Sequence, residues 1–124
     1  SSAVSYIYCL YSTEDGEPRY IGKAADKVSY RYKQHVTGAL EKEPAVLYDW
    51  MPDVWRRNFD VMCHTLQEDI VPKDESMFED YWIRQFSGLL NVAGKQLSAK
   101  DTQLGKQVKA ALRAAIELTR TQPP

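Results

Sequence analysis

The hydrophobic positions of the chain change their spacing several times, and each change predicts a new structural element. Segments rich in aromatic and branched residues are typical of strands, whereas apolar residues that recur every three or four positions indicate amphipathic helices. Asp15-Gly16, between the first two such segments, is typical of a tight hairpin turn, and Pro52 should kink or divide a helix. The pattern predicts strands at 4–11, 19–23 and 59–66, helices at 27–40, 45–57, 74–86 and 101–120, and a loop at 88–95.

The order of these elements predicts an α+β fold with a small three-stranded antiparallel sheet flanked by helices. The first two strands form a hairpin, and helices separate the second strand from the third, so that helices must cover the sheet. At 124 residues the chain fits one domain with its own core. We expect residues 1–95 to form this core. Residues 96–124 add an extra C-terminal amphipathic helix packed on or extending the same domain, which either caps the core or grips a nucleic-acid backbone.

Composition narrows the classes of function. Hydrophobic residues at 44% and charged residues at 27% are ordinary for a globular protein and exclude a mostly disordered chain. No stretch approaches the roughly 18 consecutive apolar residues of a membrane helix, so no membrane partner is expected. Cys9 and Cys63 lie in separate apolar segments without zinc-type spacing. We interpret them as reduced thiols of an intracellular, cytoplasmic protein, with a disulfide as the alternative.

Tyrosines crowd into the predicted hairpin. Because residues two apart in a strand share a face, Tyr6 and Tyr8 project together, and Tyr20 lies in the returning strand. These side chains either pack across the strands, as aromatic pairs commonly do, or contribute to a site. Gly22 follows near the strand end, where a glycine permits a sharp exit or the close approach of a ligand to the backbone.

Two basic side chains lie four residues apart on the next predicted helix and therefore share a face. Arg31 offers a planar fork of donors that matches phosphate oxygens, and His35 can donate to a phosphate or shuttle a proton near neutral pH. They are either solvated surface residues or a phosphate-handling edge. The net charge of −1 argues against a generic nucleic-acid coat, so a DNA partner would meet local positive groups, including Lys23 and Lys27.

Glu79 is unusual for its position. It lies on the apolar face of the predicted helix at 74–86, in line with Ile83, and a carboxylate there is costly unless it is paired or binds a cation. A buried ion pair with an arginine is one explanation. A magnesium-type site is the other, in which a carboxylate, waters and a substrate phosphate hold the ion. Asn91, in the following loop, tolerates a tight backbone conformation.

Together these residues resemble the GIY-YIG nuclease family. Tyr6-Ile7-Tyr8 is similar to the first signature of that family and Tyr20-Ile21-Gly22 to the second, with eleven residues between them. The resemblance spans about residues 4–95 and is greatest for compact phage and bacterial members. Two departures stand out. Tyr6 replaces the glycine of the first signature, and Arg31 follows Tyr20 one position later than the family spacing.

The resemblance implies a metal-dependent DNA endonuclease that hydrolyses phosphodiester bonds with one metal ion. Glu79 would hold one Mg²⁺ or Mn²⁺ ion per active site, and Arg31 would neutralise charge on the phosphate. Tyr8, aided by Tyr20 or His35, would take the proton of the attacking water. A free tyrosine titrates near ~10, so either nearby cations lower its pKa or His35 is the base. The expected substrate-binding residues are Gly22, Lys23, Lys27 and Asn91.

Two alternatives to this function stay open. The domain keeps the scaffold but has lost activity, and serves as a DNA-binding or protein-interaction module. Or it is a piece of a larger endonuclease whose sequence choice is made elsewhere. Both a monomer, which would nick one strand, and a homodimer are compatible with the sequence.

Overall fold

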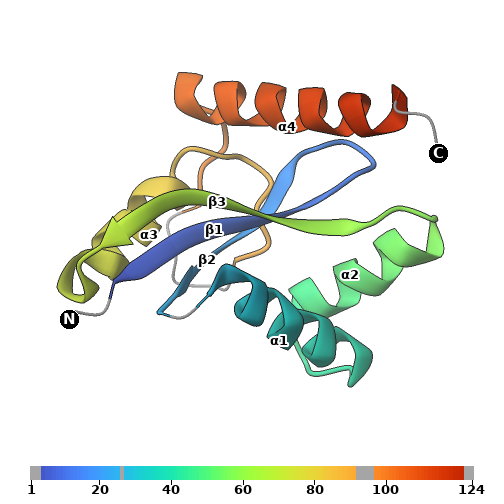
Figure 1. Cartoon of the computed structure of the whole chain (residues 1–124), viewed down its shortest axis with the longest axis horizontal. Helices are drawn as coiled ribbons and strands as arrows, with labels where there is room; N and C mark the ends of the chain where they lie inside the picture. The colour runs from blue at the N-terminus through green and yellow to red at the C-terminus, as the bar shows by residue number, and fades with distance from the viewer. Residues whose placement is uncertain (1–3, 26, 92–96, 122–124) are drawn as a thin grey trace.

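The protein is described by a computed structural model over residues 4–25, 27–91 and 97–121. Its three strands form one antiparallel sheet in the order β2-β1-β3, so that β1 is central and β2 is an edge strand. The predicted α+β fold, with flanking helices and a C-terminal helix, is confirmed (Figure 1). Along the chain the elements are β1 (Ser5–Ser12), β2 (Pro18–Ala24), α1 (Val28–Leu40), α2 (Val46–Arg56), β3 (Val61–Ile70), a 3-10 turn η1 (Pro72–Asp74), α3 (Glu75–Ile83) and α4 (Gln103–Thr121).

The larger differences from the prediction concern the ends of β3 and α3 and the continuity of α2. β3 continues to Ile70 because it pairs with β1 as far as Ser5, at the beginning of that strand. α3 ends at Ile83, ahead of the predicted end, as the chain tightens into a turn. Pro52 lies inside a single α2, so it does not divide that helix. The loop predicted at 88–95 falls partly outside the described residues.

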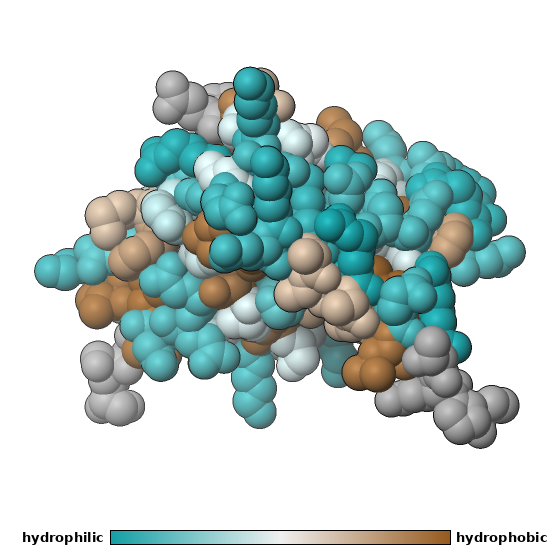
Figure 2. All heavy atoms as spheres, turned by 90° about the horizontal axis from the view of Figure 1, so that it is seen from above, coloured by the Kyte–Doolittle hydropathy of each residue, from teal (hydrophilic) through white to brown (hydrophobic). Residues whose placement is uncertain are grey.

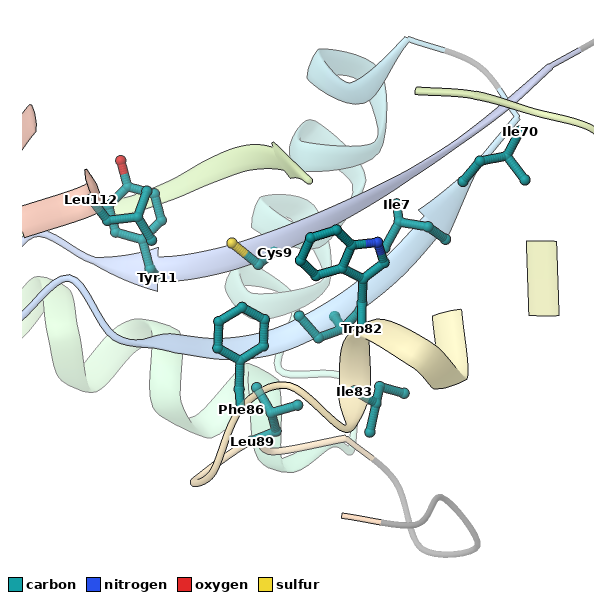
Figure 3. Close-up of a cluster of buried hydrophobic side chains, with 10 residues drawn as sticks. Ile7, Cys9, Tyr11, Ile70, Trp82, Ile83, Phe86, Leu89 and Leu112 are labelled. Carbon is teal, nitrogen blue, oxygen red and sulfur yellow. The ribbon is translucent and has the colours of Figure 1, made fainter. Parts of the chain in front are cut away.

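Helices cover both faces of the sheet and build two separate cores. The strand alternation predicted for β1 is confirmed, because Ile7 and Cys9 project to one face and Tyr8 and Leu10 to the other. We call the first the apolar face and the second the tyrosine face. In Figure 1, α4 lies along one side of the sheet and α1 and α2 along the other. The apolar face, drawn in Figure 3, packs around Ile7, Cys9, Tyr11, Ile21, Ile70, Trp82, Ile83, Phe86, Leu89 and Leu112.

The C-terminal helix caps the apolar face. Leu112 is part of the buried cluster, and Gly105 lies so close to the backbone carbonyl of Gln85 that any Cβ there would overlap it. Lys109, only 5% exposed, is held by Asp101 at 2.8 Å and by a glutamate of the β1–β2 turn. Of the two roles expected for this helix, capping is therefore the one that its contacts fit.

The outward surface above α4 is mostly polar. In Figure 2 hydrophilic side chains cover most of this view, and hydrophobic residues form separate spots between them. Within the described ranges, no helix combines the length and the apolar character that a membrane crossing requires. Cys9 and Cys63 are free thiols, which agrees with the prediction of reduced cysteines.

Candidate active site

Tyr8 and His35 meet in the middle of the tyrosine face. The hydroxyl of Tyr8 lies 2.6 Å from Nε2 of His35, and their ring centroids are 5.8 Å apart. Tyr8 is 0% exposed and His35 is 2% exposed, so this hydrogen bond is shielded from solvent. Two residues that the sequence singled out separately, one on β1 and one on α1, thus form a buried phenol–imidazole pair.

The second strand completes an aromatic cluster around this pair. Tyr20, half-buried on β2, places its ring centroid 5.3 Å from that of His35 and 6.4 Å from that of Tyr8. Gly22 is the register partner of Tyr8, and a Cβ at Gly22 would overlap the Tyr8 hydroxyl. The glycine is therefore required to seat the Tyr8 ring, and a contact of Gly22 with substrate stays a prediction.

Arg31 reaches the same hydroxyl from α1. Its guanidinium lies near enough to Tyr8 to act on the pKa of that hydroxyl, and it donates to Oε1 of Gln34 at 2.8 Å. It borders a pocket of about 210 Å³ at the end of β2, whose lining is Lys23, Ala24, Ala25, Tyr30, Arg31 and Gln34. Arg31 is thus the residue that links the buried pair to an open, positively charged pocket.

Burial controls the protonation of the pair. Burial, reinforced by neighbouring Tyr20, raises the pKa of Tyr8 well above its usual range, and the nearby Arg31 opposes this only in part. Burial and then the charge of Arg31 lower the pKa of His35 to about 4. Both groups are therefore neutral at pH 7. Arg31 by itself does not lower the pKa of Tyr8 below its usual range, because desolvation outweighs the guanidinium.

The two lysines expected to bind substrate occupy different places. The Nζ atom of Lys23 donates to Oγ of Ser76 at 3.0 Å and lies 3.8 Å from a carboxylate oxygen of Glu75, so its charge ties β2 to α3. It is not among the groups that shift the pKa of Tyr8. Lys27 is exposed just before α1, where its backbone carbonyl accepts the first helical hydrogen bonds.

Glu79 lies on α3, and Asn91 lies in the loop that follows this helix. Glu79 is 8% exposed on α3, which packs against β1 and β2, so its predicted inward orientation is confirmed. The side-chain amide of Asn91 grips the backbone of Ile21, accepting from its N–H at 3.0 Å and donating to its carbonyl at 2.8 Å. Asn91 therefore holds the edge strand, and its predicted role in substrate binding stays a prediction.

Tyr48 was not among the residues predicted for the site. This α2 residue places its hydroxyl 3.1 Å from Nδ1 of His35, and their ring centroids are 6.1 Å apart. The close approach depends on Gly38 of α1, where a Cβ would lie 2.7 Å from Cζ of Tyr48. A glycine inside a helix opposite an aromatic residue was the available signal, but it does not identify its partner without the fold.

The chemistry of the carboxylate fits a hard divalent cation. Mg²⁺ keeps several waters and is commonly bound by one or two carboxylates together with substrate phosphates, so a single inward glutamate provides a suitable ligand. Among the residues that the structure describes, no group of three or more His, Cys, Asp and Glu side chains forms a metal cage. Comparison with known proteins found no matching family model, no matching curated protein and no matching solved structure.

Proposed function

We propose that this protein is a metal-dependent DNA endonuclease that hydrolyses a phosphodiester bond at the edge of β2. The observation that carries the proposal is the convergence of Arg31, Tyr8 and His35 beside an open basic pocket. A guanidinium suited to phosphate lies near a phenol, and that phenol is hydrogen-bonded to an imidazole that is neutral at pH 7.

Phosphate binding is assigned to the pocket at the end of β2. Arg31 forms one wall and Gln34, hydrogen-bonded to it at 2.8 Å, holds its guanidinium in place. A planar donor fork at this position matches two phosphate oxygens and stabilises the charge that develops on them during hydrolysis. The pocket volume of about 210 Å³ accommodates a phosphate group with its hydration.

His35 is the net base in this proposal, and Tyr8 is the relay. Tyr8 alone is a poor base because burial raises its pKa. When the Tyr8 oxygen takes a proton from the attacking water, its own proton passes along the 2.6 Å hydrogen bond to Nε2 of His35. No free phenolate forms on this path, so the high pKa of Tyr8 does not block it.

Glu79 is the residue that would hold the divalent cation. When bound, the cation supplies Lewis-acid stabilisation of a phosphate oxygen and of the leaving oxygen. The protein contributes the carboxylate from α3 and the phosphate-binding guanidinium from α1, on opposite sides of the edge strand.

One observation favours a second candidate function, an inactive DNA-binding or interaction module. Tyr8 is 0% exposed, and a water must reach its hydroxyl for the relay to operate. If substrate binding does not open that route, the polar cluster serves only to hold α1 on the sheet, while the basic pocket still binds phosphate.

Nicking of supercoiled plasmid DNA separates the two functions. We expect the wild-type protein to nick with Mg²⁺ or Mn²⁺ and not with EDTA, and Glu79→Gln to lose this activity. Asp80→Asn, the exposed neighbour on the same helix, is the matched control and should retain it. If the wild-type protein binds DNA, as measured by fluorescence anisotropy, but does not nick it, the endonuclease proposal is rejected and the inactive DNA-binding module is favoured.

A further inference from the structure

We propose that Tyr30 is a stacking platform for an unpaired nucleobase, so that the basic pocket prefers DNA with unpaired nucleotides to a fully paired duplex. The observation that points to this is an exposed aromatic ring in the wall of that pocket, beside the guanidinium assigned to phosphate. The inference rests on the proposed function and names the form of DNA that the same site takes.

The Tyr30 side chain contributes little to the core. It is 57% exposed in the first turn of α1. Across the described segments of the chain, no aromatic ring packs on it and no group is hydrogen-bonded to its hydroxyl. Tyr32, on the same helix, donates instead to the carbonyl of Val61 at 2.7 Å. Single exposed aromatic residues are common on protein surfaces, and what sets Tyr30 apart is its place in the pocket wall.

The pocket of about 210 Å³ has two kinds of wall. Arg31 and Gln34 supply polar groups, whereas Tyr30, Ala24 and Ala25 supply an apolar surface. A nucleotide has the same two parts, an anionic phosphate and the apolar face of a base, joined through one sugar. Proteins that bind single strands combine cationic groups for the backbone with aromatic rings on which bases stack. The wall therefore matches one nucleotide, with its phosphate at Arg31 and its base on Tyr30.

The charge of α1 also fits an anionic strand. Between Val28 and Leu40 the helix carries Arg31 and Lys33 and no aspartate or glutamate, although the net charge of the whole chain is −1. Helical spacing places Arg31 about 100° around the axis from Tyr30 in one direction and Lys33 about 60° in the other. A strand crossing this surface would thus meet a cation on each side of the Tyr30 ring.

Stacking on Tyr30 requires a base whose face is free. In a duplex each face is covered by the neighbouring base pair, and only the edges of the bases are open in the grooves. A paired base can reach the ring only after it leaves the stack, which costs free energy of unstacking and unpairing. An unpaired base avoids this cost, so DNA with a gap should bind more tightly than an intact duplex.

Fluorescence anisotropy in EDTA tests this preference without requiring cleavage. The probes are a short labelled duplex and the same duplex with a gap in one strand. We expect the wild-type protein to bind the gapped DNA more tightly, and Tyr30→Ala to weaken that binding about tenfold or more with little effect on the duplex. Tyr30→Phe should bind as the wild type does, because stacking uses the ring and not the hydroxyl. Equal affinities of the wild type for both probes, or unchanged binding of gapped DNA by Tyr30→Ala, would overturn the proposal.

The fluorescent base 2-aminopurine, placed opposite the gap, reports stacking itself. Its fluorescence should fall when the wild type or Tyr30→Phe binds and should fall much less with Tyr30→Ala, measured at protein concentrations that saturate the DNA. Because Tyr30 is exposed, Tyr30→Ala should unfold in urea as the wild type does. The same quenching by Tyr30→Ala as by the wild type would show that the base does not lie on this ring.

Lys33→Gln is the matched control for charge. Lys33 is an exposed neighbour of Tyr30 on α1. Its loss should weaken binding of both probes equally and reduce the slope of log Kd against log salt concentration, whereas Tyr30→Ala should leave that slope unchanged. A loss of gap preference in Lys33→Gln equal to that in Tyr30→Ala would assign the preference to charge and overturn the stacking platform.

Cleavage separates this inference from the proposed function. A wild type that nicks DNA with Mg²⁺ but binds both probes equally overturns the stacking platform and leaves the nuclease standing. A wild type that binds gapped DNA through Tyr30 and cuts neither probe rejects the nuclease and keeps the platform. A wild type that binds neither probe rejects both.

Discussion

The two faces of the central strand β1 carry different kinds of core. Ile7 and Cys9 face a buried apolar cluster closed by α3 and α4, whereas Tyr8, between them in sequence, faces a histidine and an arginine of α1. The difference follows from one step along a pleated strand. It shows that the hairpin tyrosines are not equivalent, because Tyr8 belongs to a hydrogen-bonded polar network and Tyr11 to a hydrophobic core.

This contrast separates stability from chemistry. In the apolar face, burial of aromatic and aliphatic side chains provides the folding energy. In the tyrosine face, buried polar groups are tolerated because they satisfy one another. Within the described part of the chain, every buried side-chain nitrogen or oxygen has a hydrogen-bond partner. Substitutions of apolar side chains such as Phe86 should therefore change the free energy of unfolding, whereas substitution of Arg31 should chiefly change reactivity.

The largest effect on stability is expected from Phe86→Ala. Phe86 is fully buried in the apolar face, and removal of its ring should cost about 3–5 kcal/mol of unfolding free energy through lost burial and a residual cavity. Urea denaturation measures this. Cleavage per folded molecule should stay close to that of the wild type, and a loss of activity in the fully folded variant would break the separation between the faces.

The largest effect on activity is expected from Arg31→Ala. Loss of one donor aimed at a reacting phosphate should lower the rate of cleavage by about 10²–10³-fold, measured by single-turnover assay with saturating enzyme. Arg31 is only half-buried, so unfolding in urea should change much less than for Phe86→Ala. A wild-type rate in this variant would show that the basic pocket does not hold the scissile phosphate.

His35 should have a smaller effect, which is on how the free energy of unfolding depends on pH. Its pKa falls from near 6.5 in the unfolded chain to about 4 in the folded protein, so the unfolded state binds more protons between these values. The contribution of His35 to the free energy of unfolding should be fully present above pH 6.5. It should be lost as the pH falls toward 4, by on the order of 3 kcal/mol in total.

Urea unfolding at several pH values checks this behaviour of His35. His35→Gln should flatten the decline between pH 6.5 and 4. His64→Gln is the control. Burial also lowers the pKa of His64, but this residue lies on the exposed side of β3, so its removal should change the curve less. If the free energy of unfolding declines equally with pH in both variants, the buried imidazole of His35 is not the group responsible.

The fold was predictable because it depends on local patterns. Alternation in β1, the Asp15-Gly16 turn and the helical spacing of the C-terminal segment each act within a few residues, and the structure confirms each. The inward Glu79 was predictable for the same reason, since helical periodicity alone places it among apolar neighbours.

The partners of the site residues could not be predicted, because they depend on contacts between distant segments. The hydrogen bonds of Asn91 to Ile21 span seventy positions. The sequence around a loop asparagine does not indicate which strand backbone its side chain will bind. Tyr48 contacts His35 only because α2 packs on α1. The pKa of Tyr8 also depends on tertiary burial, which outweighs the nearby arginine that the sequence did indicate.

The most direct measurement compares metal-dependent DNA cleavage by Tyr8→Phe and Tyr11→Phe. Both variants lose one hydroxyl from the same strand, on opposite faces, and keep the ring that packs there. Tyr8→Phe should lose cleavage while remaining folded, and Tyr11→Phe should cleave at the wild-type rate. Equal rates in the two variants, or no cleavage by the wild type under any divalent cation, would contradict a catalytic role for the tyrosine face.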